Sequence, residues 1–349
     1  MIDPRQANKQ PVYRTTPIYR SLLAALLLTP PVTHALDANW IAGDGAYGTA
    51  TNWDTAPDVP LNGGVTYDVF IAGNGTDVTY DETTPGAVNT LSLGAGVTFL
   101  TDLSFSAFTA GMTFANDAKL VAEDRSQLNL GGGNLERSSL IARKGFLGSG
   151  GATLTTTVTS WSGTNGFNLD REFTADGAGS LLDLSSLTTI ERNGGSTSSD
   201  LNINASDGGE IRLTAISGFD DNVSGINGRI HLSAVGADST IDIANVTVLD
   251  NASITVQDGG DITAQLTSLT GRSQLLKHGV DDADGDSIDM IDLSQLTDAD
   301  DATLIAEDGA TLALGATSID RTDLIARKGF LGSGGATLTT TVTSWSGTN

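Results

Sequence analysis

The chain has 349 residues, with 42 Gly, 8 Pro, no Cys and 5% aromatic residues, and its 18 Lys and Arg against 42 Asp and Glu give a net charge of -24. So acidic a surface repels phosphate backbones, which excludes nucleic acid as an expected partner, and the lack of Cys excludes a disulfide framework. Long stretches rich in Gly, Thr, Ser, Asp and Asn favour short strands and tight turns over helices.

Residues 1–35 have the parts of a secretory signal peptide. An apolar run covers 22–28, small residues stand at Thr33 and Ala35, and the basic residues before the run are Arg5, Lys9, Arg14 and Arg20. A membrane span needs about 20 apolar residues, so this run is too short to be an anchor helix. The segment predicts export, and no later segment is apolar enough to predict membrane insertion.

Residues 36–117 form an N-terminal section rich in Trp and Gly, which we interpret as the first coils or a cap. It contains WIAGDG from Trp40, the pair Asn52-Trp53, and LSLGAGVTF over 91–99. Apolar and polar residues alternate over 65–71 and 88–99, which predicts strands.

These motifs resemble the start of secreted bacterial parallel β-helix surface proteins of the autotransporter-passenger-like and adhesin-like kind. The resemblance covers about 60 residues well and the rest only in its repetitive style. It implies a β-solenoid that is secreted or displayed on the surface of a bacterium, outside or at its outer membrane.

Residues 118–349 are repetitive. The 26 residues from Leu140 to Asn165 recur without change from Leu324 to Asn349, and diverged units lie between the two copies. Aligning the units on an apolar residue that follows a turn gives steps averaging about 26 residues, with these anchors: Leu128, Leu154, Leu182, Ile211, Ile241, Ile262, Ile288, Leu312 and Leu338. We also expect the chain to continue as further coils beyond Asn349, because solenoids end in a polar cap.

The spacing within units predicts an all-β fold, a right-handed parallel β-helix with coils of about 26 residues. Further apolar residues often stand two and five places after the anchor, as in Leu184 and Leu187. A strand with one face inward requires such alternation, and the crossover rule for parallel strands sets the hand. Stacked coils about 4.8 Å apart would join these residues into one aliphatic core.

Asp stands four residues before the anchor in five units, at Asp124, Asp207, Asp258, Asp284 and Asp308. A tight turn with Asp bonded to its own backbone, and Gly after it in the last four units, explains this pattern. Alternatively, Asp258, Asp284 and Asp308 stack on successive coils and bind Ca²⁺, an ion that prefers oxygen ligands. That second hypothesis predicts calcium at Asp258, Asp282, Asp284, Asp286 and Asp308.

We predict no catalytic and no cofactor-binding residues. The match to GxGxxG over 43–48 is followed by no helix that could hold a pyrophosphate, and the GFLGSGG runs lack the Lys of a phosphate loop. His231 and His278 belong to different units, with no second His beside either, and no nucleophile elbow is present.

Two functions fit the sequence. The favoured one is a secreted or cell-surface, non-catalytic β-solenoid that acts as an adhesin-like or structural stalk and contacts extracellular polysaccharide, a host or neighbouring cell, or further copies of itself. The alternative is a β-helix polysaccharide lyase or hydrolase, whose site needs carboxylates with a Lys or Arg on adjacent coils. The segment 281–292, preceded by Arg272 and Lys277, is where the sequence places such a site.

Overall fold

The computed structural model describes residues 34–73, 75–103, 106–145, 150–163, 170–191, 200–219, 229–279, 291–328 and 335–347. The chain divides into two units, Met1–Ala35 and Leu36–Asn349, and the account below concerns the second. Apart from residues 34 and 35, the predicted signal peptide lies outside the described residues.

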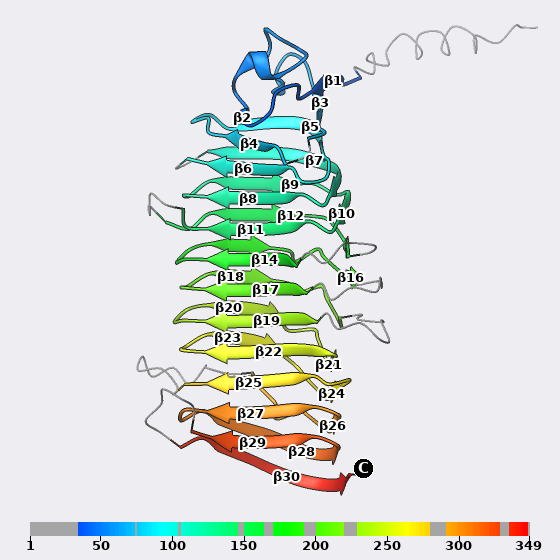
Figure 1. Ribbon diagram of the computed structural model, residues 1–349, viewed down its shortest axis with the longest axis vertical. Coiled ribbons are helices and arrows are strands. Elements are labelled where there is room, and N and C mark those ends of the chain that lie inside the picture. The colour runs from blue at the N-terminus through cyan, green and yellow to red at the C-terminus, as the bar shows by residue number, and fades with distance from the viewer. Residues whose placement is uncertain are drawn as a thin grey trace, which may run out of the picture. The chain divides into compact units, whose positions relative to one another are not determined.

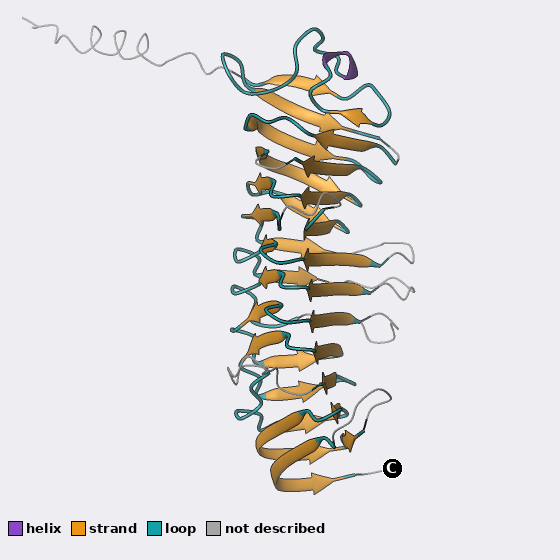
Figure 2. Ribbon diagram, turned by 90° about the vertical axis from the view of Figure 1, so that its left-hand side faces the viewer, coloured by secondary structure: helices purple, strands orange, loops and turns teal. Residues whose placement is uncertain are grey.

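The second unit is a parallel β-solenoid, which confirms the predicted fold class (Figures 1 and 2). Each strand of the ladders pairs in parallel with a strand of the next coil. The main path of the first sheet runs through β1 (Leu36–Asn39), β3 (Tyr67–Ile71), β5 (Gly86–Leu93), β7 (Ala107–Asn116), β9 (Gln127–Leu130), β12 (Thr153–Thr156), β15 (Leu181–Asp183), β18 (Glu210–Arg212), β20 (Thr240–Ile243) and β23 (Asp261–Ala264).

A side branch of the first sheet leaves β7 through β10 (Asn134–Glu136), β13 (Ser160–Ser162) and β16 (Thr189–Glu191). The second sheet runs through β2 (Gly45–Ala46), β4 (Asp77–Tyr80), β6 (Thr98–Asp102), β8 (Lys119–Glu123), β11 (Ser139–Arg143), β14 (Arg171–Asp176), β17 (Leu201–Ser206), β19 (Ile230–Val235), β22 (Ala252–Gln257), β25 (Gln274–His278), β27 (Thr303–Glu307) and β29 (Asp323–Arg327). The third consists of β21 (Val248–Asp250), β24 (Ser268–Thr270), β26 (Asp298–Asp300), β28 (Thr311–Asp320) and β30 (Thr337–Ser346).

The predicted anchors form one buried column of the first sheet. The strand register places six of them on successive coils, and all six are fully buried: Leu128, Leu154, Leu182, Ile211, Ile241 and Ile262. Leu312 and Leu338 pair in the same way on β28 and β30. The repeat length read from these residues is therefore the length of a structural coil.

One anchor was assigned wrongly. Leu293 pairs with Leu314, and its carbonyl accepts a bond from Leu296 N, as the carbonyl of Leu184 does from Leu187 N. Leu293 therefore stands two places after the anchor, and the anchor is the buried Ile291 instead of Ile288. The cause is a longer connection between the strands, because thirteen residue steps separate His278 from Ile291 where five separate Gln257 from Ile262.

The second sheet contributes two inward columns. One is large and apolar and contains Phe99, Leu120, Leu140, Phe173, Ile203, Leu232, Ile254, Leu275 and Leu304. The other is small apart from Lys277 and consists of Thr101, Ala122, Ala142, Ala175, Ala205, Ala234, Val256, Lys277, Ala306 and, exposed on the last strand, Ala326. Small residues in the second column let the sheets approach closely, and the burial of both columns supplies the main stabilisation of the unit.

Four of the five predicted Asp turns, those at Asp124, Asp207, Asp258 and Asp308, are two-residue corners with positive φ at both positions, and Asp284 lies outside the described residues. Asp207 and Gly208 have φ of 49° and 83°, and Asp258 and Gly259 have 54° and 86°. The bonds Gly209 N to Ser206 O (3.0 Å) and Gly260 N to Gln257 O (3.2 Å) close them. Asp tolerates the left-handed region better than most residues, so Asp followed by Gly suits a corner of this kind.

A second corner is closed by buried hydroxyl groups. Ser273 Oγ lies 2.6 Å from Thr270 O and 3.1 Å from Leu249 O on the preceding coil, either of which can accept its proton, and it accepts a bond from Ala252 N (3.4 Å). Ser138 and Thr322 make the same pair of bonds on other coils, to Ala115 O with Ala118 N and to Ala299 O with Ala302 N. These three side chains fasten neighbouring coils together.

The Trp-rich beginning forms an aromatic cluster inside the first coils. The rings of Trp40 and Trp53 lie 4.9 Å apart edge to face, and Tyr47 lies 4.7 Å from Trp53. Tyr47 donates to Pro60 O (2.7 Å) and Trp53 Nε1 to Tyr47 O (2.8 Å). The GxGxxG match lies here, at β2, and is followed only by the three-residue 3-10 turn η1 (Ala50–Asn52), so it has no helix for a phosphate.

The two identical 26-residue copies take different conformations. In the first, the segment bends between β12 and β13 and buries Val158 and Trp161. In the second, the matching residues form the single strand β30, and Val342 and Trp345 are exposed. The next coil covers the first copy, since Phe173 packs 5.6 Å from Trp161, edge to face.

Candidate functional site

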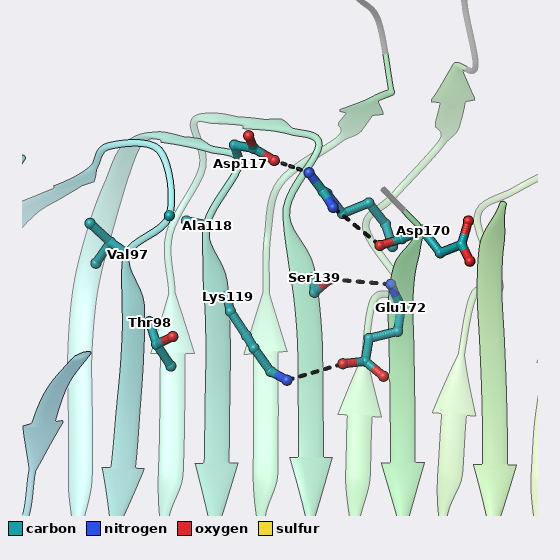
Figure 3. Close-up of a pocket in the computed structure, with 10 residues that line it drawn as sticks. Val97, Thr98, Asp117, Ala118, Lys119, Ser139, Asp170 and Glu172 are labelled. Atoms are coloured by element: carbon teal, nitrogen blue, oxygen red, sulfur yellow. Dashed lines mark hydrogen bonds and ion pairs between the residues drawn. The ribbon is translucent and has the colours of Figure 1, made fainter. Parts of the chain in front are cut away.

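A polar groove crosses the outer face of the second sheet near the starts of four strands (Figure 3). Its volume is about 330 Å³, which falls within the range of small-molecule sites. Residues of β6, β8, β11 and β14, and residues just before three of these strands, line it; those used below are Thr98, Asp117, Lys119, Ser139, Asp170, Arg171 and Glu172. Because it crosses the strands, the groove runs along the axis of the solenoid.

The strand register brings the groove residues together. Lys119 and Ser139 pair on β8 and β11, and Glu172 N donates to Ser139 Oγ (3.2 Å) from the next coil. Lys119 Nζ lies 3.1 Å from Glu172 Oε1, so this ion pair spans the small Ser139 from two coils apart. The short serine side chain leaves room beneath the pair, and Figure 3 shows the three residues side by side.

Arg171 forms the other end of the groove. Its guanidinium donates to the carboxylate of Asp117, to the carbonyl of Arg137 and to Asp170 O (3.1 Å). The Arg171 side chain is only 14% exposed, and burial lowers its pKa, although an arginine stays charged in proteins. Asp117 is held in place by its corner position, with φ of 55°.

The charges of the groove are largely matched. Lys119 faces Glu172 and Arg171 faces Asp117, while Asp170 accepts a bond from Asp200 N (2.9 Å). The half-exposed pair of Lys119 and Glu172 adds at most about 1 kcal/mol to stability. Their effect is to hold several donors and acceptors at fixed positions along one groove.

Of the predicted calcium ligands, Asp258 and Asp308 are described, whereas Asp282, Asp284 and Asp286 lie outside the described residues. Gln257, His278 and Glu307 are register partners, so Asp258, Gly279 and Asp308 follow on three successive coils. Asp258 and Asp308 thus stand two coils apart, roughly 9.6 Å, with a glycine between them. The prediction that Asp284 stands between Asp258 and Asp308 is therefore wrong, because it aligned that unit on Ile288 instead of Ile291.

Asp308 has another neighbour. Its carboxylate is 4% exposed and lies 2.8 Å from His278 Nε2, but the contact is poorly directed, and neither oxygen has a hydrogen-bond partner. His231 contacts Ser253 Oγ through Nδ1 (2.5 Å) and Asp200 through Nε2 (3.4 Å). Within the described ranges, no three His, Asp or Glu side chains gather as a metal site.

The basic residues assigned to the alternative enzyme do not meet. Arg272 occupies an exposed corner before β25, whereas Lys277 lies near the other end of that strand, faces inward and is 5% exposed. Five residue steps, most of them within β25, separate the two, which is roughly 16 Å. The acidic segment that follows them lies, over 280–290, outside the described residues.

The groove was missed in the sequence because its residues are far apart in the chain. Lys119 and Glu172 are separated by 53 positions, which is two coils. The signal was present, since aligning Leu120, Leu140 and Phe173 as one inward column would have placed Lys119, Ser139 and Glu172 beside one another.

Comparisons with protein-family models, with curated proteins and with solved structures found no match. Among the residues that the structure describes, no helix is long and apolar enough to cross a bilayer.

Proposed function

We propose that this chain is an exported, non-catalytic β-solenoid that acts at a cell surface as an adhesin-like or structural stalk. The observation that supports this proposal best is the second sheet, in which strands from β2 to β29 pair in parallel, coil upon coil, without a break in the order. Each coil contacts its neighbours and little else, so the unit behaves as a spacer whose length depends on the number of coils.

The export signal predicted for residues 1–35 and the net charge of -24 support the same proposal. A strongly acidic exterior keeps a long polar molecule soluble outside the cell and discourages it from collapsing onto anionic surfaces.

The proposal is tested by shortening the solenoid where the register permits. Leu201, Ile230 and Ala252 are equivalent on three coils, so removing residues 201–251 joins Asp200 to Ala252 and deletes two coils. The shortened protein should be exported, be accessible to protease on intact cells, and scatter as a particle roughly 10 Å shorter. Uncleaved full-length protein confined to the cell interior, or a variant that cannot fold, would contradict the proposal.

The polysaccharide-degrading alternative also gains an observation. The groove holds the carboxylates of Asp117, Asp170 and Glu172 with Lys119 and Arg171 on nearby coils, which is the combination that such a site requires. Release of unsaturated or reducing sugars by the purified chain, lost in Glu172→Gln and kept in Glu210→Gln on the other sheet, would favour the enzyme over the stalk.

A further inference from the structure

The groove is one end of a longer polar column. The outward position that holds Lys119 and Glu172 is polar on every coil of the second sheet from β6 to β29, with Thr98, Lys119, Ser139, Glu172, Asn202, His231, Ser253, Gln274, Thr303 and Asp323. Apart from the buried Ser139, these side chains are half-buried or exposed. The column therefore offers a hydrogen-bonding group about every 4.8 Å along the axis.

The spacing fits a linear polymer. Neighbouring groups of the column are about as far apart as successive rings in an extended pyranose chain, so a polysaccharide laid along the axis would meet one protein side chain for each sugar. The groove is where such a chain would sit deepest, because Ser139 forms a low floor between Lys119 and Glu172.

The charge pattern selects among polysaccharides. Lys119 is already paired with Glu172, and Arg171 with Asp117, so an acidic ligand would have to break an ion pair and approach a chain of net charge -24. Hydroxyl groups can instead accept from Lys119 and donate to Glu172 while that pair remains in place. The groove is thus suited to an uncharged ligand rich in hydroxyl groups.

We propose that the groove binds a linear, uncharged polysaccharide along the solenoid axis, and that the polar column extends this contact beyond the groove. This inference rests on the proposed stalk function and names the kind of surface that the stalk would contact. The inference also distinguishes this chain from an acidic-polysaccharide lyase, because the ligand of such an enzyme would be a polyanion.

The second repeat supplies test variants that suit the fold. At the places of Lys119 and Ser139 it has Thr303 and Asp323, which pair in the same register. Lys119→Thr and Ser139→Asp therefore take their residues from the matching positions of the second repeat, where Thr303 is half-buried and Asp323 is exposed on the last strand of the sheet. Arg212→Thr is the matched control for Lys119→Thr, because it removes one positive charge from a half-exposed side chain on the first sheet, away from the groove.

The experiment is affinity electrophoresis of the purified chain in gels that contain hydroxyethyl cellulose, β-mannan or dextran, with polygalacturonate and alginate as acidic polymers. At least one neutral polymer should retard the wild-type protein and Arg212→Thr equally. Lys119→Thr and Ser139→Asp should weaken that binding about tenfold or more, since each disturbs a charged hydrogen-bonding group. Melting temperatures of all variants should confirm that they are folded.

Retardation by the acidic polymers alone, or equal retardation of Lys119→Thr and wild type in every gel, would overturn the proposal. Failure to bind any neutral polymer would do the same. None of these results would disturb the stalk proposal, which is judged separately by export, protease accessibility and particle length.

Discussion

Trp161 and Trp345 occupy the same place in two copies of one 26-residue sequence, yet Trp161 is 2% exposed and Trp345 is 65% exposed. The difference lies in the neighbouring coil. Trp161 packs against Phe173 and donates through Nε1 to Ser138 O (2.9 Å), whereas Trp345 pairs with Ile319 on one side of its strand.

We expect truncation of the two tryptophans to have unequal effects. Trp161→Ala should lower the free energy of unfolding by about 3–5 kcal/mol, because it leaves a cavity and an unpaired Ser138 carbonyl. Trp345→Ala should change it by about 1 kcal/mol or less. Urea unfolding measures both, and acrylamide quenching should lose its most accessible component in Trp345→Phe alone. Equal losses of stability would show that the two sites are packed alike.

We expect the buried hydroxyl groups of the second corner to contribute measurably to the free energy of unfolding, although each is small. Ser273→Ala leaves the Ala252 amide without its partner inside a buried corner, where an unsatisfied group costs about 1–3 kcal/mol, and removes the donor that Leu249 O and Thr270 O share. Ser185→Ala, at an exposed position, should stay within about 0.5 kcal/mol of wild type. Thermal or urea unfolding decides this, and an unchanged Ser273→Ala would mean that water replaces the hydroxyl.

Two aspartates should respond to pH with opposite signs. Burial, followed by the charges of Glu123, Asp124 and Asp81, raises the pKa of Asp102, so its contribution is most favourable below the unfolded value near 3.8 and declines as pH rises. Asp102→Asn should therefore raise the melting temperature at pH 7 and have little effect at pH 3.

Asp54 provides the counterpart. The bonds from Asn39 N (2.8 Å) and Asn39 Nδ2 (2.7 Å) lower its pKa, so its contribution is present above the unfolded value and is lost as pH falls. Asp54→Asn should lower the melting temperature at pH 7, and the difference should shrink at pH 3. Two variants that shift in the same direction at pH 7 would contradict this assignment of causes.

The calcium hypothesis remains a prediction from the sequence and can be tested directly. If Asp282, Asp284 and Asp286 bind Ca²⁺, the melting midpoint should be higher with calcium than with chelator, since a ligand that binds only the folded state stabilises it. Replacing all three with Asn should abolish the difference, and Asp207→Asn should preserve it. Identical midpoints for the wild type in calcium and chelator would exclude the site.

The coils could be predicted from the sequence because the apolar residues that recur at regular spacing are also the residues that are buried. Leu182, Ile211 and Ile241 alternate with polar residues and follow turns, and the register places all three in one column. The same reasoning failed at Ile288, since a longer connection shifts the anchor by three residues and an apolar residue happens to stand at the expected distance. Length variation in turns is the weakness of an alignment based on apolar spacing.

To predict the groove from the sequence, the units would have to be aligned on the strands of the second sheet. An alignment on the first sheet says little about Lys119 and Glu172, which belong to the second, and the spacing between the two strands varies from coil to coil. The inward orientation of Lys277 could not be predicted from the sequence for a related reason. Its column is otherwise Ala, Val or Thr, and only the register reveals that a long basic side chain occupies the same position.

The backbone hydrogen bonds that join one coil to the next run along the axis of the solenoid. A pull applied to the two ends of that axis therefore loads every ladder in series, and the terminal coil, which pairs with a neighbour on one side only, should detach first. If the chain is a stalk, as we propose, tension should lengthen it in steps, each of which frees about 26 residues of slack chain.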